Sequence, residues 1–271
     1  ADAAKFDVNS TTGALTFKAT PDYENPTDAD SNNTYVVQVN ATDGNASVSQ
    51  LLTVTVTNDP ADDPFDFTNG LVAHYSFDGN ANDVSGNGNH GTNNGATPGI
   101  DRHGRAGKAY DFDGSDYLSF GDKQDFDMGT GDFTISAWIK TSSSSRGEIT
   151  NKGSNGSNTG YNTFVMPSGV LRIEIHDNYS AFSTATVNNG QWRHAVGMRD
   201  GDNLKLFVDG VADGSNTGVN NYDVSTSNQF FVGSREATSP FFNGSIDEVR
   251  IYNRALSAAE VAVLYNLENT P

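Results

Sequence analysis

The stretch that decides the fold lies near the C-terminus and reads GSIDEVRIYNRALSAAEV from Gly244 to Val261. Its first half places charged residues between β-forming ones, which is typical of a half-buried strand. The β-forming residues are Ile246, Val249, Ile251 and Tyr252. In the second half, Ser257 and Glu260 form an S-x-x-E capping box, and Val261, Leu264 and Tyr265 follow at helical spacing. The stretch therefore predicts the last strand of a sheet, followed by a short helix that packs on the edge or rim of that sheet.

An earlier stretch has the features of a partner for this strand. Residues 70–91 read GLVAHYSFDGNANDVSGNGNHG, a strand followed by a turn dense in Asp, Asn and Gly. Between the two stretches, short strands alternate with Gly, Asn, Asp and Ser turns, as in an all-β sandwich. Three of the strand segments are FTISAWIK at 133–140, QWRHAV at 191–196 and LFVDG at 206–210.

Together these motifs resemble a LamG-like domain, the laminin-G or concanavalin A-like jelly roll of many secreted proteins. The resemblance covers roughly residues 70–267, with the motifs in the order of the family. It implies a jelly roll of two antiparallel sheets over residues 70–271, with one short C-terminal helix and with the two ends of the domain adjacent. It is specific for the fold and weak for the ligand.

Residues 1–59 form a separate unit, and residues 60–69 form an acidic linker that contains two prolines. Strands are expected at 6–8, 12–17, 35–44 and 51–57. The unit resembles the C-terminal half of a bacterial cadherin-like repeat, an Ig-like β-sandwich, without its opening strands. Four strands without sheet partners would leave an open edge. The chain continues upstream of Ala1, or a neighbour supplies the missing strands by β-augmentation, or the unit has limited order. Because the chain opens without an initiator Met, we expect a mature fragment or an excerpt of a longer protein.

Composition narrows the classes of partner. The chain has 16 basic and 34 acidic residues and a net charge of −18, which argues against nucleic-acid binding and an anionic membrane surface. No apolar run reaches the ~18 residues of a membrane span, and no signal peptide is visible. There are no cysteines, so disulfides and thiolate metal sites are excluded. The acidic surface is either plain solvated surface or partly a set of carboxylates that hold Ca²⁺.

Two Ca²⁺ sites are predicted. Asp78, Asn80 and Asp83 lie in one tight turn, and Asp247 would join them if the ends of the jelly roll are adjacent. The alternative is an Asx-turn without metal. In the front unit, the resemblance to cadherin-like repeats implies a second ion at the acidic positions Asp22, Glu24 and Asp43. The usual linker motif is replaced there, so solvated acidic loops are the alternative.

Sugar-binding groups are sought on loops and rims. The tryptophans Trp138 and Trp192 match positions that pack in the family's core. The better candidates for ligand contact combine aromatic rings with amide, Arg or imidazole groups. They are Tyr161, His176, Asn178, Tyr179, Arg235, Phe241 and Phe242. The alternative for each of them is an ordinary polar turn.

Catalysis is not predicted. Glucanases with this fold carry an E-x-D-x-x-E run on one strand, which the chain lacks. Glu174 and Asp177 would face opposite sides of a regular strand, and the adjacent Asp247 and Glu248 would diverge as well. No G-x-S-x-G, H-E-x-x-H or P-loop motif occurs.

The sequence therefore predicts a non-catalytic, calcium-binding, extracellular adhesion or recognition module of a large bacterial secreted or surface protein. The jelly roll would recognise a glycan or a cell-surface protein, and the front unit would be part of a Ca²⁺-stiffened stalk. One alternative is a carbohydrate-binding accessory region of a secreted polysaccharide-degrading enzyme. Another is a subunit of a surface fibre that self-associates through the open edge of residues 1–59.

Overall fold

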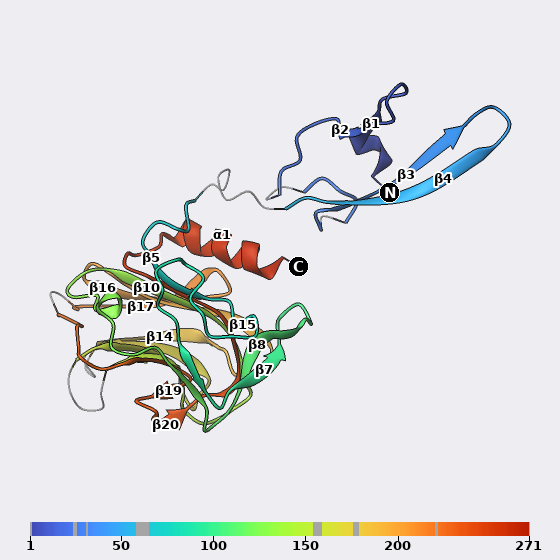
Figure 1. The fold of residues 1–271 in the computed structure, drawn as a ribbon. Helices are drawn as coiled ribbons and strands as arrows, with labels where there is room; N and C mark the ends of the chain where they lie inside the picture. The colour runs from blue at the N-terminus through green and yellow to red at the C-terminus, as the bar shows by residue number, and fades with distance from the viewer. Residues whose placement is uncertain are drawn as a thin grey trace. The chain divides into compact units, whose positions relative to one another are not determined.

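The computed structural model of the chain describes residues 1–271 except 1, 24–25, 31, 58–64, 154–158, 176–178, 220–221 and 271. It divides into two compact units, Ala1–Asp66 with Thr270–Pro271, and Phe67–Asn269. The boundaries predicted from the sequence, 59 and 70, flank a linker whose first half, residues 60–64, lies outside the described residues. Almost all regular structure is antiparallel strand, as expected for an all-β chain with one C-terminal helix (Figure 1).

The first unit consists of two hairpins and one turn of 3₁₀-helix. Its elements are η1 (Ala3–Lys5), β1 (Phe6–Val8), β2 (Leu15–Phe17), β3 (Thr34–Thr42) and β4 (Ser47–Thr55). β1 pairs with β2, and β3 pairs with β4. Phe6, Tyr35 and Val37 form its small buried cluster, in which both Phe6 and Phe17 meet the Tyr35 ring edge-on. The strands expected here are confirmed, whereas the cadherin-like assignment remains a prediction.

The second unit is a sandwich of two sheets. In spatial order, the eight-stranded sheet contains β17 (Val211–Thr217), β16 (Asn203–Val208), β15 (Trp192–Asp200), β10 (Phe133–Lys140), β21 (Asn243–Tyr252), β8 (Ala106–Asp113) and β7 (Thr97–Ile100), with β5 (Leu71–Tyr75) also on β21. The seven-stranded sheet contains β14 (Tyr179–Thr186), β13 (Val170–Ile175), β12 (Tyr161–Val165), β11 (Gly147–Lys152), β18 (Phe230–Val232), β9 (Tyr117–Ser119) and β6 (Thr92–Asn94). The hairpin β19 (Ser234–Arg235) and β20 (Thr238–Phe241) and the 3₁₀ turn η2 (Gln124–Phe126) complete the strands and turns.

The core lies between the sheets because alternate residues of each strand point inward. Ile135, Ala137 and Ile139 come from one sheet, and Leu171, Ile173 and Ile175 come from the other. At Gly197 the sheets approach closely, since a Cβ there would lie only 3.0 Å from Thr163 and 3.1 Å from Ile173. The pairing of β21 with β5 confirms that the two predicted end strands are neighbours.

The helix α1 (Ala258–Asn269) begins at the predicted capping box: Glu260 accepts the Ser257 N–H at 2.7 Å, and Ser257 Oγ accepts the Glu260 N–H at 3.2 Å. Its apolar residues Val261 and Leu264 are buried in a cluster with outward-facing residues of the eight-stranded sheet. The helix therefore covers a face of the sheet, not its edge or rim as expected (Figure 1). The reason is that β15 and β16 carry apolar residues on both faces, with Val196, Met198 and Phe207 directed outward.

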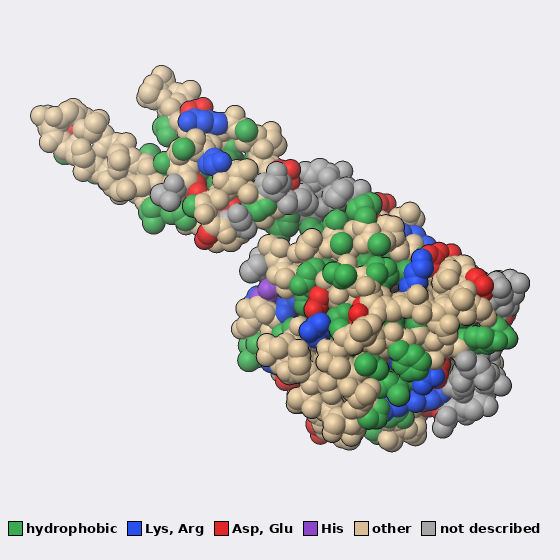
Figure 2. Space-filling view, turned by 180° about the vertical axis from the view of Figure 1, so that it is seen from behind, with side chains coloured by type: hydrophobic (Ala, Val, Ile, Leu, Met, Phe, Trp, Pro, Cys, Tyr) green, Lys and Arg blue, Asp and Glu red, His purple; other side chains and the backbone are tan. Residues whose placement is uncertain are grey.

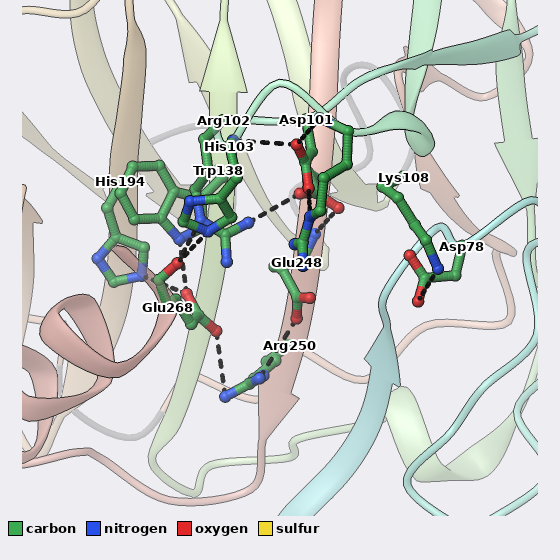
Figure 3. A network of polar contacts seen from close by, with 12 residues as sticks. Asp78, Asp101, Arg102, His103, Lys108, Trp138, His194, Glu248, Arg250 and Glu268 are labelled. Atoms are coloured by element: carbon green, nitrogen blue, oxygen red, sulfur yellow. Dashed lines mark hydrogen bonds and ion pairs between the residues drawn. The ribbon is translucent and has the colours of Figure 1, made fainter. Parts of the chain in front are cut away.

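A polar network fastens the last turn of α1 to the sheet (Figure 3). The buried carboxylate of Glu268 accepts the Trp138 indole N–H at 2.6 Å and lies 3.1 Å from the Arg250 guanidinium. Tyr265 stacks on Trp138 with centroids 5.6 Å apart. Trp138 is thus buried, as expected, but beneath the helix and not between the sheets. Trp192 is only half-buried, so the expectation of a core position is wrong for it.

Candidate functional site

The outward face of the seven-stranded sheet carries a row of polar side chains. On β12 and β13, Tyr161, Ile173 and Ile175 point into the core, so alternation directs Asn162 and Glu174 outward. The strand register then aligns three residues side by side, because Asn162 pairs with Asn151 on β11 and with Glu174 on β13. Two amides and one carboxylate from three neighbouring strands therefore lie next to one another.

This row forms the floor of a small pocket that is open to solvent. Arg235 of β19, outside the two main sheets, lines the pocket as well. The residues that line it are Asn151, Gly153, Thr159, Gly160, Tyr161, Asn162, Glu174 and Arg235. Asn151 is 1% exposed, and its Oδ1 accepts no hydrogen bond from the described residues. Because a buried oxygen without a donor is costly, it predicts a donor that enters the pocket from outside.

A second row next to the first is filled by its own side chains. The Arg146 guanidinium lies 3.7 Å above the centre of the Phe164 ring, and Arg172 lies 5.3 Å from it. Arg146 also pairs with Glu148 at 2.5 Å, and burial raises the pKa of Glu148 to about 7 against the opposing charges of Arg146 and Arg235. Phe164 is completely buried, so its ring does not serve as a platform for a ligand.

The side chains predicted to contact a ligand are only partly brought together. Arg235 lines the pocket. Tyr161 contributes to the pocket lining, yet its ring is buried in the core and its hydroxyl donates to the Phe126 carbonyl at 2.9 Å, so the expectation of an exposed ring is wrong. Tyr179 lies at the start of β14, with its hydroxyl 2.6 Å from that of Tyr222. His176 and Asn178 lie outside the described residues.

The two remaining phenylalanines lie at the C-terminal end of the β19–β20 hairpin. Phe241 is half-buried, with its ring centre 6.5 Å from that of Tyr117. Phe242 is 1% exposed and packs edge-on against Phe112 in the core, so it offers no surface to a ligand.

The residues of the first predicted Ca²⁺ site have other partners. Asp83 accepts the backbone N–H groups of His74, Ser85 and Asn89 at 2.9–3.0 Å, and these bonds lower its pKa against the effect of burial. Asn80 accepts the N–H of Asn82 at 2.8 Å. Asp78 pairs with Lys108 at 3.2 Å, to one side of the polar network (Figure 3).

Asp247 belongs to the network beneath α1. It pairs with Arg102 at 2.8 Å, and burial raises its pKa to about 8. Glu248 accepts from His74 at 2.6 Å and from Arg250 at 3.3 Å, and these contacts lower its pKa to about 2 against the effect of burial. The two carboxylates do not diverge as expected from regular alternation, because Glu248 has a φ of 49° and the β10–β21 register shifts beside it.

The front unit separates the residues of the second predicted Ca²⁺ site. Asp43 caps the β3–β4 turn by accepting the N–H groups of Asn45 and Ala46, each at 2.9 Å. Asp22 lines a hollow together with Tyr35, which lies at the other end of β3 from Asp43. At the usual rise per residue of a strand, Tyr35 and Asp43 are about 25 Å apart. Glu24 lies outside the described residues. Within the described part of the chain, no group of three or more His, Asp or Glu side chains could hold a metal ion. Calcium binding therefore remains a prediction from the sequence.

A family model described as the concanavalin A-like lectin/glucanases superfamily, Laminin_G_3, matches residues 112–262. The match covers more than half of the chain, so the chain belongs to this superfamily. No curated protein matches the sequence. Among the described residues, no helix combines the length and the apolar character that crossing a membrane requires.

Several solved structures are similar. Domain 4 of AbnA, a GH43 extracellular arabinanase from Geobacillus stearothermophilus, was solved in complex with arabinotriose. It is 25% identical with a TM-score of 0.58, and the match covers 72% of this chain and 98% of that domain. The binding domain of Paraclostridial Mosquitocidal Protein 1 is 18% identical with a TM-score of 0.61, covering 73% of this chain.

A botulinum neurotoxin type C structure, reported for cell entry that depends on two ganglioside molecules, is 14% identical with a TM-score of 0.60 and covers 74% of this chain. The matches span only 52% of each of the two toxin chains. Their likeness to this chain establishes the shared fold, which is one used by binding domains.

Proposed function

We propose that the chain is a non-catalytic carbohydrate-binding module that takes a sugar residue of a glycan into the pocket on β11, β12 and β13. The observation that carries the proposal is the buried Oδ1 of Asn151, in a pocket whose lining also includes the Asn162 amide, the Glu174 carboxylate and the Arg235 guanidinium. Sugar hydroxyls both donate and accept hydrogen bonds. They can therefore donate to Asn151 and accept from Asn162, and they can add hydrogen bonds to Glu174 and Arg235 beside the interactions that these two residues already make.

The pocket is small and open to solvent, so it admits hydroxyl groups of a sugar that lies over it, and not a folded peptide element. The polar groups come from strands of a sheet, which holds them in a fixed array before the ligand arrives.

The setting that we propose is extracellular, in a large modular bacterial protein that is secreted or attached to the cell surface. In that setting the module would recognise glycans during adhesion. The arabinanase domain favours a second role, as the carbohydrate-binding accessory region of a secreted polysaccharide-degrading enzyme, because that domain is similar over nearly its whole length.

The test is binding of the full chain to arabinotriose and to an immobilised glycan panel. We expect Asn151→Ala and Asn162→Ala each to weaken binding about tenfold, which corresponds to the loss of one hydrogen bond or two. Asn189→Ala is the matched control, because Asn189 lies in an exposed turn beyond the other end of β14. A wild-type chain that binds no glycan, or pocket variants that bind like the wild type, would refute the proposal.

A further inference from the structure

One aromatic ring on the same face of the sheet has no role in the core. Phe182 of β14 is 47% exposed and is the one exposed phenylalanine among the described residues. Its neighbour Ala181 belongs to the core, so alternation directs Phe182 to the outward face. The other outward positions of β14 are Ser180, Thr184 and Thr186, which are small and polar. An isolated exposed apolar residue is common on protein surfaces, so the position of this ring matters more than its exposure.

Phe182 is contiguous with the proposed sugar pocket. It pairs in register with Arg172, whose guanidinium lies 5.0 Å from the ring centre. Arg172 forms an ion pair with Glu174, and Glu174 lines the pocket. The Arg172 guanidinium thus contacts both the Phe182 ring and Glu174 of the pocket. Ser180, the register partner of Glu174, lies between the pocket and the ring.

We propose that Phe182 is a second, aromatic subsite, and that this face binds a chain of sugars laid across the strands, not a single terminal sugar. This inference rests on the proposed function of the pocket. The apolar face of one sugar ring would cover Phe182, while a neighbouring unit of the same chain occupies the pocket between Asn151, Asn162 and Glu174. The ligand class is therefore an oligosaccharide or polysaccharide segment.

The spacing of the strands requires a chain. Asn162 and Phe182 lie two strands apart, and Phe182 is offset by two residues from Ser180, which lies on the Asn162 row. At the usual ~4.8 Å between strands and ~3.3 Å per residue along a strand, the two positions are about 12 Å apart. One ring cannot fill the pocket and cover Phe182 at the same time, whereas a trisaccharide spans this distance.

The experiment is calorimetric titration of the full chain with arabinose, arabinobiose and arabinotriose, for the wild type, Phe182→Ala and Phe182→Trp. We expect the wild type to bind the trisaccharide more tightly than the monosaccharide. Phe182→Ala should lower the affinity for the trisaccharide about five- to tenfold, because the exposed half of the Phe182 ring is no longer there to be covered by a sugar. The affinity for the monosaccharide should stay unchanged. Phe182→Trp should retain the preference for the longer sugar. Val211→Ala is the control, because Val211 is exposed on β17 of the other sheet.

The outcomes separate this inference from the proposed function. If Asn162→Ala loses binding and Phe182→Ala binds the trisaccharide like the wild type, the pocket stands and the second subsite is wrong. An equal loss for monosaccharide and trisaccharide in Phe182→Ala also rejects the subsite, since it indicates a general structural effect. If the wild type binds none of the three sugars and no member of the glycan panel, both proposals fall together.

Discussion

At the scale of single residues, Lys152 shows how one buried charge joins segments that are far apart in the sequence. Its side chain is completely buried, and its ammonium group donates to Asp122 at 3.1 Å and to the carbonyls of Thr226 and Asn228 at 3.0 and 2.8 Å. Asp127 lies 3.3 Å away. One cation thus ties β11 to the segment before β18 and to the segment around η2.

We expect Lys152→Met to lower the free energy of unfolding by about 3 kcal/mol, because carboxylates and carbonyls would remain without the cation that they face. Chemical denaturation of the full chain measures this. Lys205→Met is the control, since Lys205 pairs with Asp200 at the surface and should change stability by less than about 0.5 kcal/mol. Equal effects of the two substitutions would show that the burial of Lys152 adds nothing to the free energy of unfolding.

Single residues of the site were largely hidden from sequence analysis. Asn151, Asn162 and Phe182 lie in strands whose alternation can be read, but nothing in the sequence states which strand pairs with which, or in what register. Tyr161 was expected on the surface because it follows a polar loop, yet it is the first inward residue of β12. Arg235 was among the candidates because it stands next to Glu236, and the two together have the charged composition of a sugar site.

At the scale of elements, the attachment of α1 should depend on pH through Glu268. Burial raises the pKa of Glu268 above its ordinary value of 4.5, and the nearby Arg250 offsets this only in part. Between 4.5 and the raised value, the folded chain binds more protons at this site than the unfolded chain. Its stability therefore falls as pH rises through this window. Asp247 acts in the same direction, so the effect of Glu268 must be isolated by a variant.

We expect the stability of the wild type relative to Glu268→Gln to fall by about 1–3 kcal/mol between pH 5 and pH 8. Denaturant titrations at several pH values measure this difference. Glu260→Gln is the control: burial raises the pKa of Glu260, but the contacts with Arg254 and Ser257 together outweigh it and lower the pKa, so its difference from the wild type should stay flat above pH 5. If the stability difference between the wild type and Glu268→Gln stays constant with pH, or changes in the opposite direction, the pH dependence does not come from Glu268.

The elements themselves were well predicted where local signals suffice. The strand at the end of the chain, the helix and its capping box follow from residues close in sequence, and the structure confirms them. The packing of the helix on a face of the sheet could not be predicted, because it depends on outward apolar residues of β15 and β16, some fifty residues upstream. The bulge at Glu248 could not be predicted either, since it is imposed by pairing with β10.

At the scale of the whole molecule, the two units differ in how much core they have. The second unit buries a large apolar cluster between two sheets, whereas the buried apolar cluster in the described part of the first unit consists of Phe6, Tyr35 and Val37. Val48 and Leu51 of β4 are 70% and 66% exposed in the first unit. Self-association through this unit, foreseen from its missing strands, remains a prediction.

The ends of the second unit meet through β5 and β21, at the junction where the sequence predicts a Ca²⁺ site. In the structure, the junction is held by other contacts: Asp83 binds three backbone N–H groups, and Asp247 binds Arg102. An ion that binds only the folded state at a hundred times its Kd would add about 2.7 kcal/mol to stability. The observed contacts leave these carboxylates little capacity for such an ion. We therefore expect that this junction contributes no Ca²⁺-dependent rise to the melting temperature of the full chain, measured in Ca²⁺ and in EDTA.

Asp83→Asn distinguishes the possible results of this melting experiment. Without an ion at the junction, the variant should melt at a lower temperature by the same amount in both solutions, because the amide replaces one of the oxygens that accept from His74, Ser85 and Asn89. A rise with Ca²⁺ in the wild type that disappears in Asp83→Asn would restore the sequence-based assignment. A rise that survives in the variant would place the ion elsewhere in the chain, and the contacts at the junction would then be sufficient to join the two ends by themselves.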